Sequence, residues 1–278
     1  MLKKIFAGLI LLTLLIWGGF CLSVYYFPQR FFYHPSNTKP MVAHAIINEF
    51  PAAEVHYTSK DGTPLFGWYV APKNGKVIVF FHGNSHNIEA FYHKLTPFTE
   101  AGYGVLLAEY RGFGGIGGEI NQQNLADDSI AAVQYLKDKG FSNKNIILYG
   151  MSLGSYTSTY VASTLEGEEA FSGLVLEVPF DSLINVVKQR IIPLFPFKII
   201  IKDKYDNVPL IKKVKAPVFV MGASKDKVVP LERARELFKH IQSRKKMMVY
   251  SGAGHSSLYN YRNWRDILDW LKSNEKIK

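Results

Sequence analysis

The sequence contains a single cysteine, Cys21, among its 278 residues. One thiol cannot form an internal disulfide, and it cannot supply the ligands of a zinc finger or a cysteine-bound iron–sulfur cluster. Charged side chains are also scarce, at 20% of the residues, whereas 47% are apolar and 14% aromatic. This composition excludes a disordered polyelectrolyte, because the chain has enough apolar surface to fold around a sizeable core.

Acidic residues are absent from positions 1–40, which carry four Lys or Arg. Residues 41–180 carry 8 basic and 14 acidic side chains, whereas residues 181–278 carry 21 basic and 9 acidic ones. The net charge of +10 is therefore concentrated in the C-terminal third. Such a region can face an anionic membrane, nucleic acid or solvent. Because no recognised nucleic-acid-binding motif accompanies the charge, we expect no nucleic-acid partner.

A long stretch without charge extends over residues 5–27, after Lys3 and Lys4. As a helix it would measure about 34 Å, enough to cross a hydrocarbon core of about 30 Å. A cleaved signal peptide is the alternative, but its apolar region is usually about 7–15 residues long and ends in small residues. This stretch ends in the aromatic sequence Tyr-Tyr-Phe-Pro, which suits a membrane interface. We therefore expect residues 1–30 to form a retained single-pass anchor.

The charges that flank this stretch bear on its orientation. Lys3, Lys4 and the amino terminus lie on one side, and Arg30 and Lys39 lie on the other. Positive charge favours the cytoplasmic side of a membrane. The small excess predicts a cytoplasmic N-terminus and places the rest of the chain outside the cytoplasm.

From about residue 50, short β-branched runs alternate with stretches of helical composition. The expected strands are Val55–Thr58, Leu65–Ala71, Val77–Phe81, Val105–Ala108, Ile146–Tyr149, Leu174–Val178, Val218–Gly222 and Met247–Tyr250, and the expected helices are Ile88–Ala101, Gln123–Lys139, Leu153–Leu165, Leu231–His240 and Leu258–Lys272. This alternation predicts an α/β fold with a mostly parallel sheet and helices on both faces. Without repeats or a flexible linker, residues 50–278 are expected to form one domain.

One interval is longer than a simple crossover between parallel strands. About 40 residues separate Val178 from Val218, and the part from Lys188 to Lys215 carries eight Lys or Arg against two Asp. This insertion, at about 183–215, is both apolar and basic. It is interpreted either as a lid over an active site or as a helical excursion with a solvated face.

The sequence Gly-Met-Ser-Leu-Gly at 150–154 has the pattern G-x-S-x-G. It follows the expected strand Ile146–Tyr149 and precedes a helical stretch. A strand-turn-helix junction of this kind exposes a serine hydroxyl on a strained turn. We therefore predict that Ser152 is a nucleophile, with glycines at 150 and 154 because a side chain there would obstruct the approach of helix and strand.

A serine nucleophile needs a base, and the base needs a carboxylate to orient it. Asp226 and His255 follow the expected strands Val218–Gly222 and Met247–Tyr250, at the edge where open α/β sheets gather their sites. We predict that His255 is the base and Asp226 its partner, with Asp181 as the alternative carboxylate.

A tetrahedral intermediate also requires donors for its oxyanion. In this type of junction one backbone N–H comes from the residue after the nucleophile, here Leu153, and another from the loop after an earlier strand. The sequence Phe-His-Gly-Asn-Ser at 81–85 occupies that loop. We predict that Asn84 provides the second N–H, with Ser85 as the alternative, and that His82 braces the loop through hydrogen bonds.

Taken together, these motifs resemble the α/β-hydrolase superfamily. The resemblance rests on Phe-His-Gly-Asn at 81–84, Tyr-Arg-Gly-Phe-Gly at 110–114, Gly-Met-Ser-Leu-Gly at 150–154, Lys-Asp-Lys-Val-Val-Pro around Asp226 and Gly-His at 254–255. Within the superfamily the chain is similar to N-terminally anchored serine hydrolases that act on esters or thioesters, including protein depalmitoylases. The resemblance implies an eight-stranded sheet and a Ser-His-Asp triad that uses no metal and no cofactor.

The glycines at 112, 114 and 117 also satisfy the dinucleotide-binding pattern G-x-G-x-x-G. That site needs a helix to begin at once and an acidic residue about 20 positions later, after the next strand. Here the helical pattern begins near Gln123, and Asp138 lies at a helix end. We therefore expect no nucleotide site.

The function predicted from the sequence is a serine hydrolase that cleaves ester or thioester bonds of acyl or lipid-like substrates, or of lipidated proteins, at a membrane. Two alternatives remain open at this point. One is a serine peptidase of the same fold, although no acidic recess for an ammonium group is visible. The other is a non-catalytic binding module, which the presence of all three triad residues disfavours.

Overall fold

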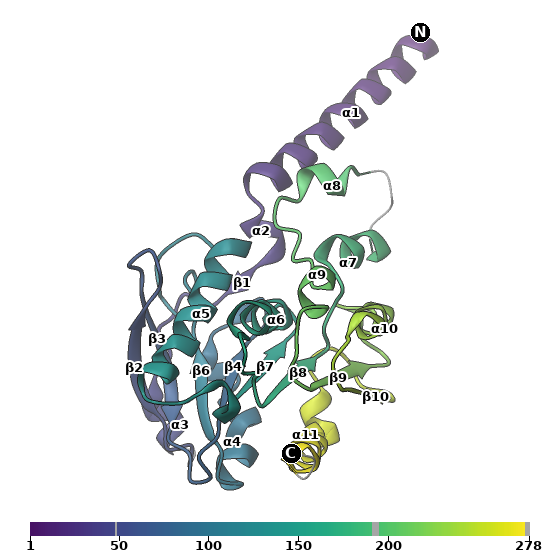
Figure 1. Ribbon diagram of the computed structural model, residues 1–278. Coiled ribbons are helices and arrows are strands. Elements are labelled where there is room, and N and C mark those ends of the chain that lie inside the picture. The colour runs from purple at the N-terminus through teal and green to yellow at the C-terminus, as the bar shows by residue number, and fades with distance from the viewer. Residues whose placement is uncertain (48, 191–194, 276–278) are drawn as a thin grey trace.

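The computed structural model describes residues 1–47, 49–190 and 195–275 (Figure 1). Its centre is an eight-stranded sheet with the order β10-β9-β8-β7-β4-β6-β3-β2. The strands are β2 (Ala53–Thr58), β3 (Pro64–Val70), β4 (Val77–Phe81), β6 (Gly104–Ala108), β7 (Ile146–Met151), β8 (Gly173–Glu177), β9 (Val218–Ala223) and β10 (Lys245–Tyr250). The pairs β2–β3 and β3–β6 are antiparallel and the others are parallel, which confirms the predicted sheet.

Both faces of the sheet are apolar because helices cover both. In β4, Val77, Val79 and Phe81 belong to one core cluster, whereas Ile78 and Phe80 belong to the other. All five side chains are at most 1% exposed. Burying a large apolar side chain contributes about 1.5–3 kcal/mol relative to exposure, so β4 stabilises the packing on both faces of the sheet.

The helices lie in two layers on either side of the sheet (Figure 1). One layer contains α5 (Gln122–Asp138), α6 (Gly154–Leu165) and α10 (Leu231–His240), and the other contains α3 (Val42–Ile47), α4 (Tyr92–Glu100) and α11 (Asn263–Glu275). Short 3-10 turns are η1 (Ile88–Ala90), η2 (Asn143–Asn145) and η3 (Leu258–Tyr261). Two predictions were therefore wrong in part, because the single helices expected over 88–101 and 258–272 are each divided into a 3-10 turn and an α-helix. Arg262, with a φ of +59°, separates η3 from α11.

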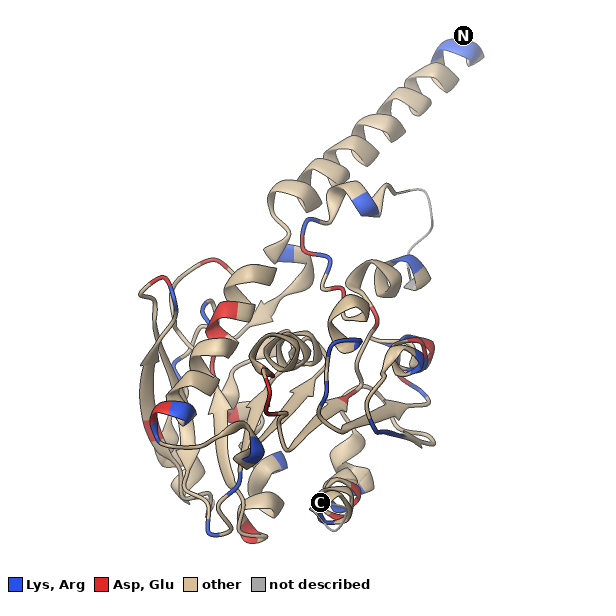
Figure 2. Ribbon diagram, in the orientation of Figure 1, with Lys and Arg blue, Asp and Glu red and all other residues tan. Residues whose placement is uncertain are grey.

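The uncharged N-terminal stretch forms the single helix α1 (Leu2–Tyr26), which projects away from the sheet (Figure 1). Among the described residues it is the one helix long and apolar enough to cross a membrane, a test that a signal sequence also passes. Val24 is its one buried residue. Figure 2 shows α1 without charge between the basic residues at its tip and those near its base.

The insertion between β8 and β9 contains α7 (Leu183–Arg190), α8 (Phe197–Ile200) and α9 (Val208–Ile211). Part of the expected range 183–215, residues 191–194, lies outside the described residues. Helix α8 packs beside the end of α1, where Val24 shares an apolar cluster with Phe197 and Ile200. The insertion is therefore in contact with α1.

Residues that connect α1 to the sheet pack onto the folded domain. They form α2 (Gln29–Phe32), β1 (His34–Pro35) and α3. Strand β1 pairs in parallel with β5 (Ser85–His86), which makes a separate two-stranded sheet. The structure of residues 31–47 and the small two-stranded sheet were not predicted from the sequence.

Candidate active site

Ser152 occupies the sharp turn between β7 and α6. Its φ is +53°, a left-handed conformation that costs free energy for a residue with a side chain. The Ser152 N–H donates to the Glu177 carbonyl at 2.9 Å, which ties the turn to the neighbouring strand β8. Only 7% of Ser152 is exposed. The strained strand-turn-helix junction predicted for this residue is therefore present.

Close packing at this junction explains the two glycines of the motif. A Cβ on Gly150 would lie 2.2 Å from the Gly154 carbonyl oxygen and 2.2 Å from the Ser158 hydroxyl. A Cβ on Gly154 would lie 1.9 Å from the Phe81 carbonyl oxygen. Real atoms do not approach so closely. The predicted steric reason for both glycines is confirmed.

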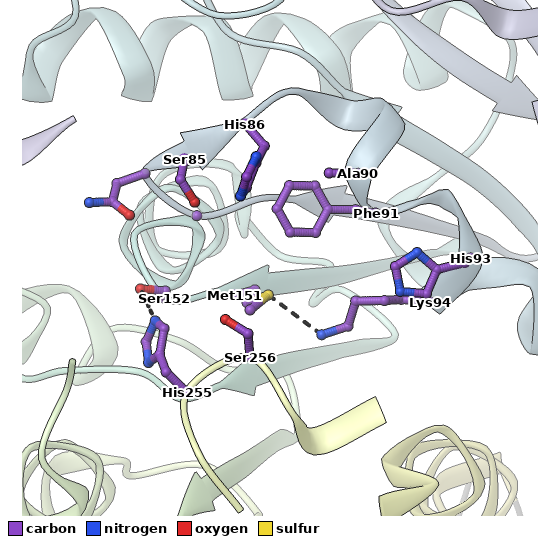
Figure 3. Close-up of a pocket in the computed structure, with 12 residues that line it drawn as sticks. Ser85, His86, Ala90, Phe91, His93, Lys94, Met151, Ser152, His255 and Ser256 are labelled. Carbon is purple, nitrogen blue, oxygen red and sulfur yellow. Dashed lines mark hydrogen bonds between the residues drawn. The ribbon is translucent and has the colours of Figure 1, made fainter. Parts of the chain in front are cut away.

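The turns after β9 and β10 bring Asp226 and His255 to the serine, and Figure 3 shows His255 beside Ser152. His255 Nε2 lies 3.0 Å from the Ser152 hydroxyl oxygen, and His255 Nδ1 lies 2.7 Å from Asp226 Oδ2. One hydrogen-bonded chain thus joins Ser152 to His255, which is 103 positions away in the sequence, and His255 to Asp226, which is 29 positions away. This geometry lets the imidazole accept the hydroxyl proton while its other nitrogen faces a carboxylate.

Asp226 is fixed by bonds to its second oxygen as well. Asp226 Oδ1 accepts the backbone N–H groups of Val228 at 2.7 Å and Val229 at 2.8 Å, and the side chain is 1% exposed. The alternative carboxylate, Asp181, instead accepts hydrogen bonds from Asn185 and Arg233. Of the two carboxylates proposed from the sequence, Asp226 is therefore the one hydrogen-bonded to the histidine.

Both expected oxyanion donors lie beside the serine. Asn84 and Leu153 line one small cavity together with Ser152. Leu153 precedes the first turn of α6, so its N–H belongs to the helix end, where backbone donors lack intrahelical partners. The loop of Asn84 passes close to the nucleophile, since a Cβ on Gly83 would lie 3.5 Å from Ser152 Cβ. Ser85, the alternative donor, lines the polar cavity on the other side.

The start of this loop is held by a buried histidine and a carboxylate. His82 Nδ1 donates to the Gly83 carbonyl at 2.8 Å, and His82 Nε2 lies 2.8 Å from Glu109 Oε1. Both side chains are fully buried. Glu109 Oε2 also accepts the Ile88 N–H at 3.0 Å, which holds the far end of the loop. The bracing role of His82 was predicted, but Glu109 was missed, although an acidic residue directly after the apolar strand β6 was a visible signal.

Two cavities meet at Ser152. The polar cavity has a volume of about 230 Å³ and is lined by Ser85, His86, His93, Lys94 and Ser256 among others (Figure 3). The apolar cavity has a volume of about 80 Å³ and is lined by Phe32, Phe180, Leu183, Val186 and Val229 among others. Because the serine lies at the boundary, the two sides of a bound carbonyl would meet different surroundings.

Lys94, which lines the polar cavity, is held from below by a buried ion pair with Glu177, which does not line it. Lys94 Nζ donates to Glu177 Oε1 at 2.6 Å, and the two side chains are 5% and 0% exposed. Tyr149 donates a hydrogen bond to the other oxygen of Glu177. Burial, and then the neighbouring Lys94 charge, lower the pKa of His93 below its ordinary value. His93 therefore contributes a neutral imidazole to this cavity near neutral pH.

The glycine-rich loop does not have the geometry of a dinucleotide site. Helix α5 begins at Gln122, well after Gly112 and Gly114. Gly114 has a φ of +57°, and its N–H donates to the Ser36 carbonyl at 2.8 Å. A Cβ on Gly114 would also lie 2.6 Å from Glu109 Oε2. Gly114 thus allows close packing around the buried carboxylate and the segment after α1.

The eight-stranded sheet, the strained serine turn and the chain order of serine, aspartate and histidine define an α/β-hydrolase fold. Solved structures agree: the Pyrococcus furiosus esterase Pf2001 superimposes with a TM-score of 0.69 at 19% identity, covering 87% of this chain and 96% of that one. The model of the prolyl oligopeptidase family matches residues 89–277. The chain belongs to this family of α/β hydrolases.

Two relatives illustrate the range of similar sequences. An uncharacterised protein of Mycobacterium tuberculosis, Rv2307c, is 29% identical over 247 residues, which cover 87% of this chain and 85% of the relative. The human alpha/beta hydrolase domain-containing protein 17B is 25% identical over 211 residues, which cover 74% of this chain and 69% of the relative. The similarity to both relatives therefore extends over most of this chain.

Proposed function

We propose that this protein is a serine hydrolase that cleaves carboxylic ester or thioester bonds of acyl substrates through a covalent acyl-enzyme. The observation that carries the proposal is the unbroken hydrogen-bonded chain from Ser152 through His255 to Asp226. A serine hydroxyl is a poor nucleophile, and this chain supplies both the base and the group that orients the base.

The reaction proceeds in two halves. In the first, the Ser152 oxygen attacks the acyl carbonyl while His255 Nε2 takes the hydroxyl proton, and the imidazolium then gives that proton to the departing alcohol or thiol. In the second, a water molecule loses a proton to His255 and attacks the acyl-enzyme, and the proton returns to Ser152 as the acid is released. Asp226 stabilises the imidazolium in both halves.

Negative charge develops on the carbonyl oxygen in each half. The backbone N–H groups of Asn84 and Leu153 are the proposed donors to it. Such donors stabilise the transition state more than the ground state, and losing one typically lowers kcat by about 10²–10³-fold. Because both donors are backbone groups, their effect depends on how the two turns are held.

The two cavities support an acyl substrate with a polar leaving group. The apolar cavity suits the acyl chain, and burial raises the pKa of Tyr33 and Tyr205 in its wall, so both phenols stay neutral. The polar cavity, with His86, Lys94 and Ser256, suits the leaving group. Leu183 and Tyr205 come from the insertion, which supports its proposed role as a cover over the acyl chain.

The side chains around the C-terminal end of α1 support a location at a bilayer surface. Tyr26 and Phe27 are exposed there, and Ile199 of α8 is 71% exposed. Lys202 Nζ lies 3.9 Å from the centroid of the Tyr25 ring. Aromatic and basic side chains of this kind favour a membrane interface. We propose a single-pass anchor with the catalytic domain outside the cytoplasm, acting on acyl chains or lipidated proteins.

Hydrolysis by the full-length protein in detergent tests the proposed reaction. We expect turnover of p-nitrophenyl esters and acyl thioesters, and loss of at least about 10³-fold in kcat for Ser152→Ala. Ser163→Ala is the matched control, because the Ser163 hydroxyl bonds the Tyr160 carbonyl within α6 and should not affect turnover. A folded wild type with no turnover across the panel, or equal rates for Ser152→Ala and wild type, would contradict the proposal.

The family to which the chain belongs makes peptidase activity the second candidate. Among the described residues that line the polar cavity there is no carboxylate, so an amino-terminal ammonium has no counter-charge there. We therefore expect aminoacyl anilides to be cleaved far more slowly than esters of the same acyl group. Faster cleavage of the anilides would favour the peptidase.

A further inference from the structure

The segment between the anchor helix and the main sheet is hydrogen-bonded to the loop of the proposed oxyanion donor. We call residues 32–38 the juxtamembrane strand. The His34 N–H donates to the Asn84 carbonyl at 2.8 Å. In return, Asn84 Nδ2 donates to the Phe32 carbonyl at 2.8 Å. Asn84 is thus held through both its backbone and its side chain.

The contact continues along the loop. The Ser36 N–H donates to the His86 carbonyl at 3.0 Å, and Asn87 Nδ2 donates to the Thr38 carbonyl at 2.9 Å. On its other edge the juxtamembrane strand accepts the Gly114 N–H through the Ser36 carbonyl. It therefore lies between the loop of Asn84 and the glycine-rich loop, and it bonds to both.

The loop needs such support because its own conformation is strained. His86 has a φ of +66°, which a residue with a side chain adopts only when its surroundings enforce it. The His82–Glu109 pair holds the start of the loop, and Ile88 holds its end. Between these points, the bonds that fix Asn84 come from the juxtamembrane strand.

We propose that the juxtamembrane strand is a positioning element of the oxyanion hole, so that the segment leaving the membrane aligns the Asn84 N–H with the reacting carbonyl. This inference rests on the proposed serine hydrolase function. An oxyanion donor acts mainly in the transition state, so misplacing it lowers kcat and leaves KM nearly unchanged. The residues after the anchor thereby set the rate of the enzyme as well as its location.

His34 offers a test that changes one backbone hydrogen bond. His34→Pro removes the N–H that bonds the Asn84 carbonyl, whereas the control His34→Ala keeps it, and the His34 side chain is exposed. Tyr33 already has the extended φ of −127° and ψ of 142° that a following proline requires. In the full-length protein we expect His34→Pro to lower kcat at least about 10-fold relative to His34→Ala, with KM within about twofold.

A transition-state analogue separates positioning from general damage. A boronic acid that forms a tetrahedral adduct on the serine should lose affinity for His34→Pro by the same factor as kcat/KM. Equal kcat and equal analogue affinity for folded His34→Pro and His34→Ala would overturn the inference. If the wild type hydrolyses no ester, the proposed function fails instead, which is a distinct result.

Asn84→Ala gives a second measurement in case His34→Pro does not fold. It keeps the backbone N–H of residue 84 and removes only the side-chain bond to the Phe32 carbonyl. We expect a lower kcat, an unchanged KM and weaker boronic acid binding. An unchanged kcat with unchanged analogue affinity would count against the positioning role.

Discussion

In the proposed mechanism, the imidazole of His255 acts as a base at Nε2, which requires that its Nδ1 carry a proton that faces an acceptor. Asp226 Oδ2 is that acceptor at 2.7 Å. Asp226→Asn keeps the size of the side chain and removes its charge, so the imidazole loses its orientation and its stabilising partner. We expect kcat to fall by about 10³–10⁴-fold with little change in thermal unfolding, as measured by ester hydrolysis and calorimetry in detergent.

Asp181→Asn is the matched control for this residue. Asp181 is 1% exposed and accepts hydrogen bonds from Asn185 and Arg233. Its substitution should therefore lower the free energy of unfolding, whereas kcat, measured per folded molecule, should not change. If Asp181→Asn reduced kcat as strongly as Asp226→Asn at equal folded fraction, the assignment of the carboxylate would be wrong.

At the scale of elements, α6 can cross close over β4 because Gly154 has no side chain. The Cβ of Gly154→Ala would lie 1.9 Å from the Phe81 carbonyl oxygen, which is backbone and cannot move away alone. Overpacking usually costs about 1–3 kcal/mol, and this contact should reach or exceed the upper value. Gly167→Ala, with nothing within 4 Å of its added Cβ, should leave the unfolding midpoint unchanged. Equal midpoints for the two variants would contradict this packing.

The loop before α5 is joined to that helix by a buried ion pair. Arg111 Nη2 lies 2.6 Å from Asp128 Oδ1, and the two side chains are 4% and 0% exposed. Arg111 also pairs with Asp61, which lowers the pKa of that exposed carboxyl. Asp128→Ala should cost about 3–5 kcal/mol of unfolding free energy, because it leaves the buried Arg111 charge with only the exposed carboxylate of Asp61 and the Ser59 hydroxyl as partners. Asp61→Ala should cost much less in the same urea titration, and the reverse order would contradict this account.

The elements that could be predicted from the sequence are those that are stabilised by a regular pattern of apolar side chains. Strands such as β4 and β7 are continuous apolar runs, and the helices between them have the matching length. The serine turn and the positions of Asp226 and His255 followed from the turns at strand ends. By contrast, β1 and β5 contain two residues each and are joined through backbone hydrogen bonds, which leave no periodic signal. The break at Arg262 and the hydrogen bond that the Ile88 N–H donates to Glu109 depend likewise on three-dimensional surroundings.

At the scale of the whole molecule, helix α1, the insertion and the apolar cavity adjoin one another. Phe32 and Leu183 line the apolar cavity and also pack against the cluster that joins α1 to α8. This continuity supports the proposal that the substrate is an acyl chain at a membrane. Exposed Lys198, Lys202 and Lys204 would then face the lipid headgroups.

These lysines give a prediction for the protein reconstituted in vesicles. Each lysine near an anionic leaflet contributes about 1 kcal/mol, so anionic lipid should increase hydrolysis of a vesicle-borne acyl ester. The triple variant Lys198→Glu, Lys202→Glu and Lys204→Glu should lose this increase, and salt should reduce it in the wild type. The control variant with Lys60→Glu, Lys73→Glu and Lys272→Glu changes the same number of exposed charges elsewhere on the protein. It should retain the increase in hydrolysis caused by anionic lipid. Equal behaviour of both triple variants would contradict a docked orientation.

The central claim is that Ser152 becomes acylated because His255 activates it. Mass spectrometry of the full-length protein after reaction with a fluorophosphonate tests this claim most directly. We predict one adduct, on the peptide that contains Ser152, and a labelling rate that falls by several orders of magnitude in His255→Ala. An adduct on another residue, or labelling of His255→Ala at the wild-type rate, would contradict the account.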